Sequence, residues 1–438
     1  MGQILITYNS IYNLEILNIL LLPIDIIIVF FKIITMTVSL TPYITNNLPG
    51  SHQDKLLELV TLDAALNANI PKPIRAQTEQ LLRLVNSFYS NKIEGNPTLP
   101  NEILKTQYGE KDTTKKSKGI NEILSHLEIQ LKLTGSILFD KDDVYDPTFM
   151  KLLHEQFFKY LPKEYLIVKD KNNKPVKDKA GKIISITPGA FRKHNVKVGD
   201  HIPPEPSQID AYIKWYTSSY DFNKIFGTNK ILAAICSHHR FSWIHPFMDG
   251  NGRVGRLLTD CQLKLAGLGG SGLWTISRGL GRDTDSYYRA LSLADKSRQG
   301  DTDGRGILSD KGLISFIEYF LDTALDQVKY FSDLLDPHNL RTRIDIYFEY
   351  RARGSFTDHN GDKLAPLRIE SKDIYRTLLE RGDMSRAELY KILGKGESTI
   401  RPILNKMAKE HLINAPKRKD ISLNLSPSSI AVIFPQLW

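Results

Sequence analysis

Cysteine is scarce in this chain, which has only Cys236 and Cys261 among its 438 residues. Two isolated cysteines cannot form a disulfide framework, and their spacing fits no zinc site. Both stand within apolar helical patterns, so we expect buried free thiols. The chain also lacks a long low-complexity tract, and its 41% hydrophobic residues indicate that most of it folds.

A strong charge imbalance is missing too. Lysine and arginine number 58 against 49 acidic residues, which gives a net charge of +9. This excess favours anionic partners such as nucleotides, nucleic acid or acidic protein surfaces, although a solvated surface alone would account for it. At 438 residues the chain exceeds one typical core, so it should hold more than one domain.

A long uninterrupted apolar run is also absent. Residues 16–34 have the length needed to cross a bilayer, but Pro23, Asp25 and Lys32 interrupt them. Lys32 is the first basic residue, which argues against a cleaved signal peptide. Two interpretations stay open: a membrane anchor that leaves the rest of the chain in the cytoplasm, or a tail ahead of a true start at Met36. In both cases we expect a cytoplasmic folded part.

Helical periodicity is what the chain has in abundance. Apolar stripes predict a helix over 51–96 and further helices over 119–135, 146–160, 207–219, 228–242, 252–266, 286–296 and 309–334. The segment from Lys163 to Asp200 is rich in Lys, Asp and Gly and has short β-branched runs, which predicts a projecting β-hairpin. The fold class is therefore mainly α, with one β excursion from a helical body.

The C-terminal part has a different pattern. Residues 371–435 are predicted as three helices, the third from Ser398 to His411, followed by strands at Ile421–Leu425 and Ile430–Phe434. This is the outline of a small α+β winged-helix domain. We divide the chain into an apolar segment (1–40), a helical region (41–135), a central core (136–335), a linker (336–370) and this domain (371–438).

The most informative string is HPFMDGNGRVGR, from His245 to Arg256, between two predicted helices. Gly250 and Gly252 remove side chains where backbone amides must approach a ligand, and the following helix begins with unpaired N–H groups, so an anion is the expected ligand. Arg253 and Arg256, with Asn251, add donors suited to a polyphosphate.

Two residues at the start of this string carry chemistry of other kinds. Asp249 offers one carboxylate beside the expected phosphates, which is enough for Mg²⁺, because that ion keeps phosphate and water as its other ligands. His245 titrates near neutral pH and is placed to act as a general base on an incoming hydroxyl. A metal site from His238, His239 and His245 was the weaker alternative, since adjacent histidines point apart on a helix.

The string matches the HPFxDGNGRxxR signature of Fic-domain proteins at every specified position, and the resemblance covers about residues 40–330. It implies a helical Fic core and transfer of AMP from ATP, with Mg²⁺, to a Ser, Thr or Tyr hydroxyl of a target protein or of the chain itself. In that family His245 would be the catalytic base and Asp249 the metal ligand. The phosphate-binding residues would be Gly250, Asn251, Gly252, Arg253 and Arg256.

Three further segments resemble parts of that family. SNKIEGN, from Ser90 to Asn96, resembles the inhibitory motif, in which Glu94 pairs with Arg256 and prevents the γ-phosphate of ATP from seating. Residues 189–204 resemble the flap that adds a strand to the target segment. Tyr288 resembles an adenosine contact, whereas its neighbour Tyr287 is a better candidate for the core.

The C-terminal segment leaves a rival function open. Gly394 and Gly396 lie in the predicted turn, and the second helix has Ser398, Arg401, Lys406 and Lys409. Such a module binds DNA or serves as a contact for a homodimer or another partner, and this helix has few side chains suited to base edges. The alternatives are thus a DNA-binding regulator that senses nucleotide, a toxin-like transferase, or an enzyme that removes AMP. The intact arginines favour AMP transfer over phosphate transfer.

Overall fold

The computed structural model describes residues 40–107, 118–134, 144–159, 161–170, 172, 174–269, 272–357 and 363–438. The apolar segment 16–34 and Met36 lie outside these ranges, so both interpretations of that segment stay predictions. Among the described residues, no helix has both the length and the apolar character that a bilayer crossing requires.

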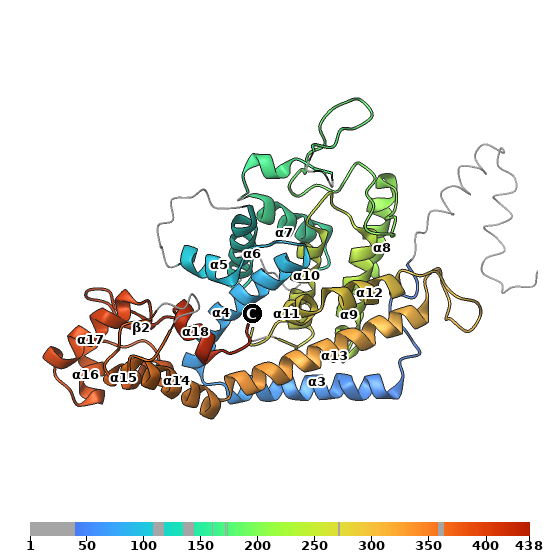
Figure 1. Ribbon diagram of the computed structural model, residues 1–438. Helices are drawn as coiled ribbons and strands as arrows, with labels where there is room; N and C mark the ends of the chain where they lie inside the picture. Colours follow the sequence, from blue (N-terminus) through green and yellow to red (C-terminus); the bar gives the residue numbers. More distant parts are fainter. Residues whose placement is uncertain are drawn as a thin grey trace, which may run out of the picture.

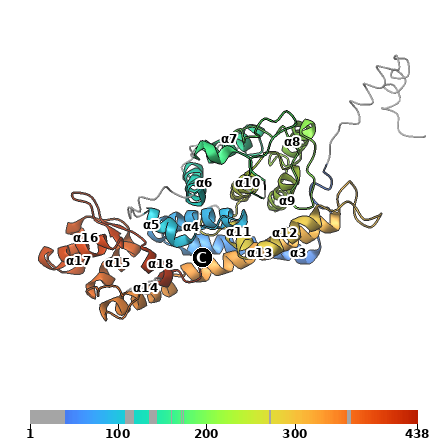
Figure 2. The same cartoon turned by 45° about the horizontal axis from the view of Figure 1, so that its top comes forward.

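The protein is mainly helical, as predicted. Two long helices, α3 (Gly50–Asn69) and α13 (Asp310–Leu335), lie side by side along one edge of the body (Figures 1 and 2). The helix expected over 51–96 is broken in two, because Ile70 is extended and Pro71 caps α4 (Lys72–Ile93). Proline has no N–H to continue a helical hydrogen-bond ladder, so a new helix starts after it.

The centre of the body is the pair α9 (Asn229–Ile244) and α10 (Asn251–Leu265), which pack against each other. Helix α4 packs against α10 and α6 (Lys118–Thr134). Helix α7 (Pro147–Lys159) also packs against α10. Most of α10 is buried, including its two arginines, because other helices surround it. The remaining helices of the body are α5 (Pro100–Gln107), α6 (Lys118–Thr134), α7 (Pro147–Lys159), α8 (Ile209–Ser219), α11 (Ile276–Arg282) and α12 (Thr284–Ala294).

The predicted β excursion is a small closed coil rather than a simple hairpin. The amide of Val168 donates to the carbonyl of Ile184, that of Ile184 to Val176, and that of Val176 to Val168, so three short extended pieces bond in a ring. Each of the two turns is tied by an aspartate, Asp170 and Asp178, whose Oδ1 accepts two backbone amides. Hydrogen bonds within the segment therefore hold its described residues in this shape.

The segment 336–370, predicted as a linker, is mostly ordered structure. Asp336 caps α14 (Pro337–Ala352) by accepting from the amides of His338 and Asn339, and α14 packs against α13. Helix α14 also packs against α18 (Pro427–Ile433) of the C-terminal module.

The C-terminal module keeps the predicted order of helices and hairpin, with one correction. The strand expected at Ile430–Phe434 is helix α18 (Pro427–Ile433), which Ser426 caps by accepting from the amide of Ser429. The hairpin pairs Ile413 with Leu423 instead. The module contains α15 (Glu370–Arg381), α16 (Arg386–Leu393), α17 (Glu397–Lys409), β1 (Ile413–Asn414) and β2 (Ser422–Leu423).

After α18 the chain returns to the body, where Figure 1 marks its end beside α4. Arg278 of α11 donates to the carbonyls of Gln436 and Leu437. The Trp438 ring meets Phe88 of α4 edge to face, with 5.5 Å between ring centroids. The C-terminal module is thus fastened to the helix that carries Glu94.

Candidate active site

The loop between α9 and α10 is shaped by two left-handed residues. His245 ends α9 at φ 50°, and Gly250 precedes α10 at φ 81°. A Cβ on Gly250 would stand 2.9 Å from the Phe158 ring, so glycine is required by both conformation and space. The turn aims the first amides of α10 into the space in front of His245, where the positive end of the helix favours an anion.

Asn251 holds the loop in this shape. Its Oδ1 accepts from the Phe247 amide at 2.8 Å, and its Nδ2 donates to the Phe247 carbonyl, also at 2.8 Å. The side chain is 3% exposed, so it is committed to the loop rather than open to a ligand. The phosphate-binding role predicted for Asn251 stays a prediction; its backbone amide lies in the first turn of α10, where an anion is expected.

The His245 imidazole is neutral near pH 7. Burial lowers its pKa to about 4, although the Ser242 carbonyl opposes the shift. Its Nδ1 lies 3.4 Å from that carbonyl, an arrangement that favours the proton on Nδ1 and leaves Nε2 as the acceptor. A neutral imidazole with an open Nε2 has the form that a general base needs.

Asp249 lies at the mouth of the loop with its side chain half exposed. Its Oδ1 accepts from the Gly250 amide at 2.5 Å and from Arg253 Nη2 at 3.1 Å. Burial opposes ionisation, but Arg253 and the Gly250 amide outweigh it and lower the pKa of the Asp249 carboxyl. An ionised, partly open carboxylate next to an anion cradle fits Mg²⁺, which takes one or two protein oxygens at phosphate sites.

Arg256 is almost fully buried and is held from α4. Its Nη2 donates to Glu94 Oε1 at 2.6 Å and to the Ser90 carbonyl at 2.7 Å, while its Nε donates to Ser90 Oγ at 2.9 Å. Burial disfavours the charged guanidinium, but Glu94 outweighs it and raises the pKa of Arg256. Ser90 and Glu94, predicted to share one helix face, therefore meet the same arginine.

Gly252 explains how Glu94 fits. A Cβ on Gly252 would lie 2.0 Å from Glu94 Oε1 and 3.0 Å from Arg256 Nη1. The carboxylate thus rests on the bare backbone of the first turn of α10, where an anion is expected. Glu94 occupies with its own negative charge part of the space that the amides and Arg256 prepare for a ligand.

The flap segment 189–204 is attached to the loop between α9 and α10 by Arg192 and His154. Arg192 donates through Nε to the His245 carbonyl at 2.8 Å and through Nη2 to the Pro204 carbonyl at 2.5 Å. His154 of α7 stacks on Phe247, accepts from the Gly189 amide at Nδ1 and donates from Nε2 to the Asp249 carbonyl. Neither residue lies in the motif, and no local pattern marks them.

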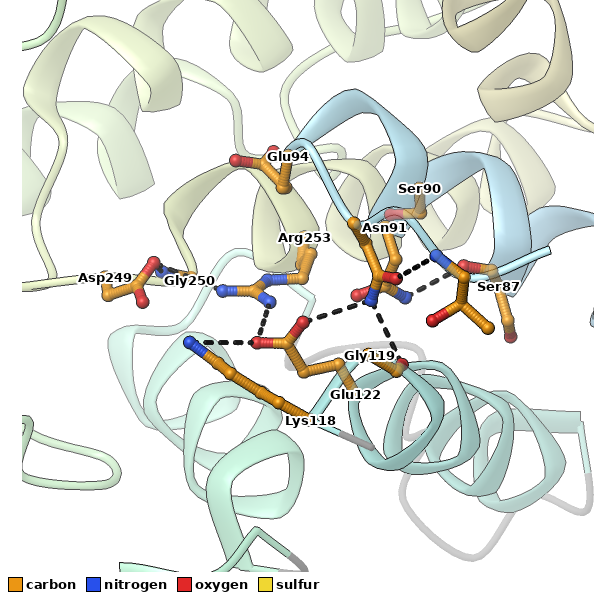
Figure 3. A network of polar contacts seen from close by, with 12 residues as sticks. Ser87, Ser90, Asn91, Glu94, Lys118, Gly119, Glu122, Asp249, Gly250 and Arg253 are labelled. Carbon is orange, nitrogen blue, oxygen red and sulfur yellow. Dashed lines mark hydrogen bonds and ion pairs between the residues drawn. The ribbon is translucent and has the colours of Figure 1, made fainter. Parts of the chain in front are cut away.

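Glu122 of α6 is the other residue that the sequence did not reveal. Figure 3 shows it directly beside Arg253, whose Nη1 lies 3.2 Å from Glu122 Oε1. Asn96, just beyond α4, donates to Glu122 Oε2 at 3.1 Å. Since α6 lies far from the motif in sequence, its apolar periodicity predicts a helix but does not predict which arginine it faces.

The two tyrosines after the motif differ in exposure. Tyr287 is buried and its hydroxyl meets His238 Nε2 at 2.7 Å, so it belongs to the core. Tyr288 is 46% exposed and donates to the Ile93 carbonyl at 2.9 Å, at the end of α4. His239 bonds Asp295 at 3.0 Å, so His238 and His239 face different partners.

Comparison with known proteins places this site in a family. Residues 146–263 match the Fic/DOC family. "Protein adenylyltransferase Fic" of Aedes aegypti is 36% identical over 87 residues, which is 20% of this chain and 17% of that protein. The protein of the same name from Culex quinquefasciatus is 27% identical over 218 residues, 49% of this chain and 37% of that protein. The chain thus matches less than half the length of these relatives.

Two solved structures are also similar. A Fic family protein from Desulfovibrio desulfuricans G20 has a TM-score of 0.46 at 17% identity, with 89% of this chain and 98% of that chain covered. Fic-1 (134–508) from C. elegans has a TM-score of 0.46 at 15% identity, with 74% and 78% covered. The match to the Fic/DOC family over residues 146–263 includes the whole loop from His245 to Arg256, so this part of the chain is similar to a Fic domain.

Proposed function

We propose that this protein transfers AMP from ATP to a hydroxyl of a target protein, or of itself, and that Glu94 restrains the reaction. The observation that carries the proposal is a neutral His245 with an open Nε2, set at the rim of an anion cradle made by the first turn of α10 and two buried arginines. The name of the matched relatives, protein adenylyltransferase, supports it.

The chemistry follows from these positions. The target hydroxyl gives its proton to His245 Nε2 as its oxygen bonds to the α-phosphorus of ATP. The bond from that phosphorus to the oxygen bridging the β-phosphate breaks, and pyrophosphate leaves. Gly250, Gly252 and the amides beside them bind phosphate oxygens, while Arg253 and Arg256 stabilise charge that grows on the leaving group.

Asp249 is the residue that would hold Mg²⁺. The ion would neutralise charge on the phosphates when bound. The Asp249 carboxylate, kept ionised by Arg253, fixes the place of that charge relative to the first turn of α10. Tyr288, half exposed near the end of α4, would lie toward the adenosine.

The experiment uses wild-type protein and the variants Glu94→Gly, His245→Ala and the double variant, each incubated with Mg²⁺ and α-labelled or γ-labelled ATP and lysate. A hydrogen bond between charged groups is worth about 1.5–3 kcal/mol, so releasing Arg256 should raise labelling roughly tenfold to a hundredfold. We expect α-label on protein in Glu94→Gly and its loss in the double variant. Transfer of γ-label only would instead mean phosphate transfer, and no label in any variant would reject the proposal.

A DNA-binding regulator is the second candidate, and one surface favours it. Helix α17 exposes Arg401 and Lys409, and the turn between β1 and β2 exposes Lys417, Arg418 and Lys419. Such a helix and basic wing suit a duplex backbone. Fluorescence anisotropy with duplex DNA at several salt concentrations tests this: binding that weakens steeply with salt and is lost in Arg418→Ala supports it, and flat anisotropy at low salt rejects it.

A further inference from the structure

Arg253 has two carboxylate partners, which come from different parts of the fold. Its Nη2 lies 3.1 Å from Asp249 Oδ1 in the loop, and its Nη1 lies 3.2 Å from Glu122 Oε1 on α6. The Phe157 ring lies 4.5 Å from the guanidinium carbon. The guanidinium is therefore charged and fixed in orientation before any ligand arrives.

Glu122 is itself held in place. The residue is 9% exposed, its Oε2 accepts from Asn96 Nδ2 at 3.1 Å, and Lys118 lies 3.7 Å from its Oε1. Asn96 also donates to the Gly119 carbonyl at 3.0 Å and accepts from the Thr98 amide (Figure 3 shows the contacts around Glu122). The Asn96 side chain thus joins the end of α4 to the start of α6.

We propose that Glu122 is a positioning residue that sets the orientation of Arg253 for the nucleotide phosphates, and that Asn96 makes this setting depend on the end of α4. The proposal rests on the proposed function. Asn96 lies two residues after Glu94, so one short stretch reaches both arginines: Glu94 covers Arg256, and Asn96 supports the carboxylate that aims Arg253.

The physical reason is the geometry of the guanidinium, whose donors form a rigid planar fork. Because Nη2 donates to Asp249 and Nη1 lies in an ion pair with Glu122, carboxylates on two sides hold the plane of this fork. Neutral glutamine at position 122 keeps the size and one acceptor but loses the charge–charge attraction. ATP would still bind to this variant, because an anionic neighbour of the phosphates has been removed. The Arg253 side chain, however, would no longer have a fixed orientation, so it would not hold the phosphates in the reactive geometry.

The test compares Glu122→Gln with a matched control, Glu128→Gln, which lies on the same helix, is about half exposed and faces Lys132. Both are made in the Glu94→Gly background. For Glu122→Gln we expect kcat to fall roughly ten- to hundredfold, while KM and the calorimetric Kd for ATP stay the same or fall. Glu128→Gln should leave all three unchanged. Glu122→Asp, which keeps the charge, should recover part of kcat.

The link through Asn96 has its own readout. Asn96→Ala should lower kcat in the same direction as Glu122→Gln, and the double variant should be no slower than Glu122→Gln alone, because both changes act on one chain of contacts. Additive losses would overturn the link. Equal kcat for Glu122→Gln and Glu128→Gln, or a loss of kcat that comes with higher Kd and lower thermal stability, would overturn the positioning role. If Glu94→Gly itself transfers nothing, the proposed function fails, and the ATP affinities still show whether Glu122 acts on nucleotide binding.

Discussion

His245 lies in the predicted catalytic motif and has a left-handed backbone conformation that few residues other than glycine adopt. Its left-handed φ of 50° turns the chain out of α9 and sets the imidazole in a buried place beside the Ser242 carbonyl. The motif predicts a general base at His245, but it does not predict the lowered pKa, which comes mainly from burial and to a smaller extent from the charge of Arg192.

The pH dependence of transfer follows from that pKa. Because the folded pKa of His245 is about 4, the base is unprotonated at all pH values well above 4. The initial rate of the Glu94→Gly variant should therefore be flat from about pH 8 to pH 5 and fall below that, as His245 gains a proton. Initial rates measured across this range, with circular dichroism to confirm folding, check it; an inflexion near 6.5, the usual value, would contradict it.

Among helices and loops, periodicity predicted well where a helix has one buried stripe. The ranges 119–135 and 146–160 correspond closely to α6 and α7. Periodicity predicted the wrong element where a single residue determines the backbone conformation. Pro71 divides the first long helix into two. Ser426 and Pro427 start helix α18 in a stretch whose β-branched residues predict a strand. The contact between α6 and Arg253 could not be predicted, because it depends on how helices pack.

Asp63 gives a test of how α3 is attached to the body. Its Oδ1 accepts from Trp274 Nε1 at 2.6 Å and from the Gly269 amide at 2.9 Å, and the residue is 2% exposed. Asp63→Ala would leave two buried donors unpaired, so the free energy of unfolding should fall by about 2–4 kcal/mol. Urea denaturation measures this. Asp54→Ala, an exposed aspartate on the same helix, should change it by less than about 0.5 kcal/mol.

The molecule as a whole buries several neutral histidines. Burial lowers the pKa of His126 and His238 to about 3 and that of His154 and His245 to about 4. Below pH 6.5 the unfolded chain takes up protons that the folded protein does not, so the free energy of unfolding falls as the pH drops from about 7 toward 4. Each such histidine costs about 1.4 kcal/mol per pH unit in this window.

Denaturation at pH 7, 6 and 5 measures this slope. His126→Gln should make the slope shallower, because one buried titrating group is gone. His338→Gln, which changes an exposed histidine of α14, should leave the slope as it is. A slope that His126→Gln does not alter would show that this residue is not the neutral buried group described above.

The closed β coil between α7 and α8 bonds its own strands in a ring, and its two ends are already joined, since the Ile186 amide donates to the Leu166 carbonyl at 2.7 Å. Because the two ends of this segment are hydrogen-bonded to each other, the segment can be replaced without moving the residues on either side of it. Replacing residues 168–184 with a short turn, or inserting a small reporter domain there, should therefore leave the helical body and its loop at His245 intact. The coil is thus a suitable attachment point for a label that reports on the protein without disturbing its helical body.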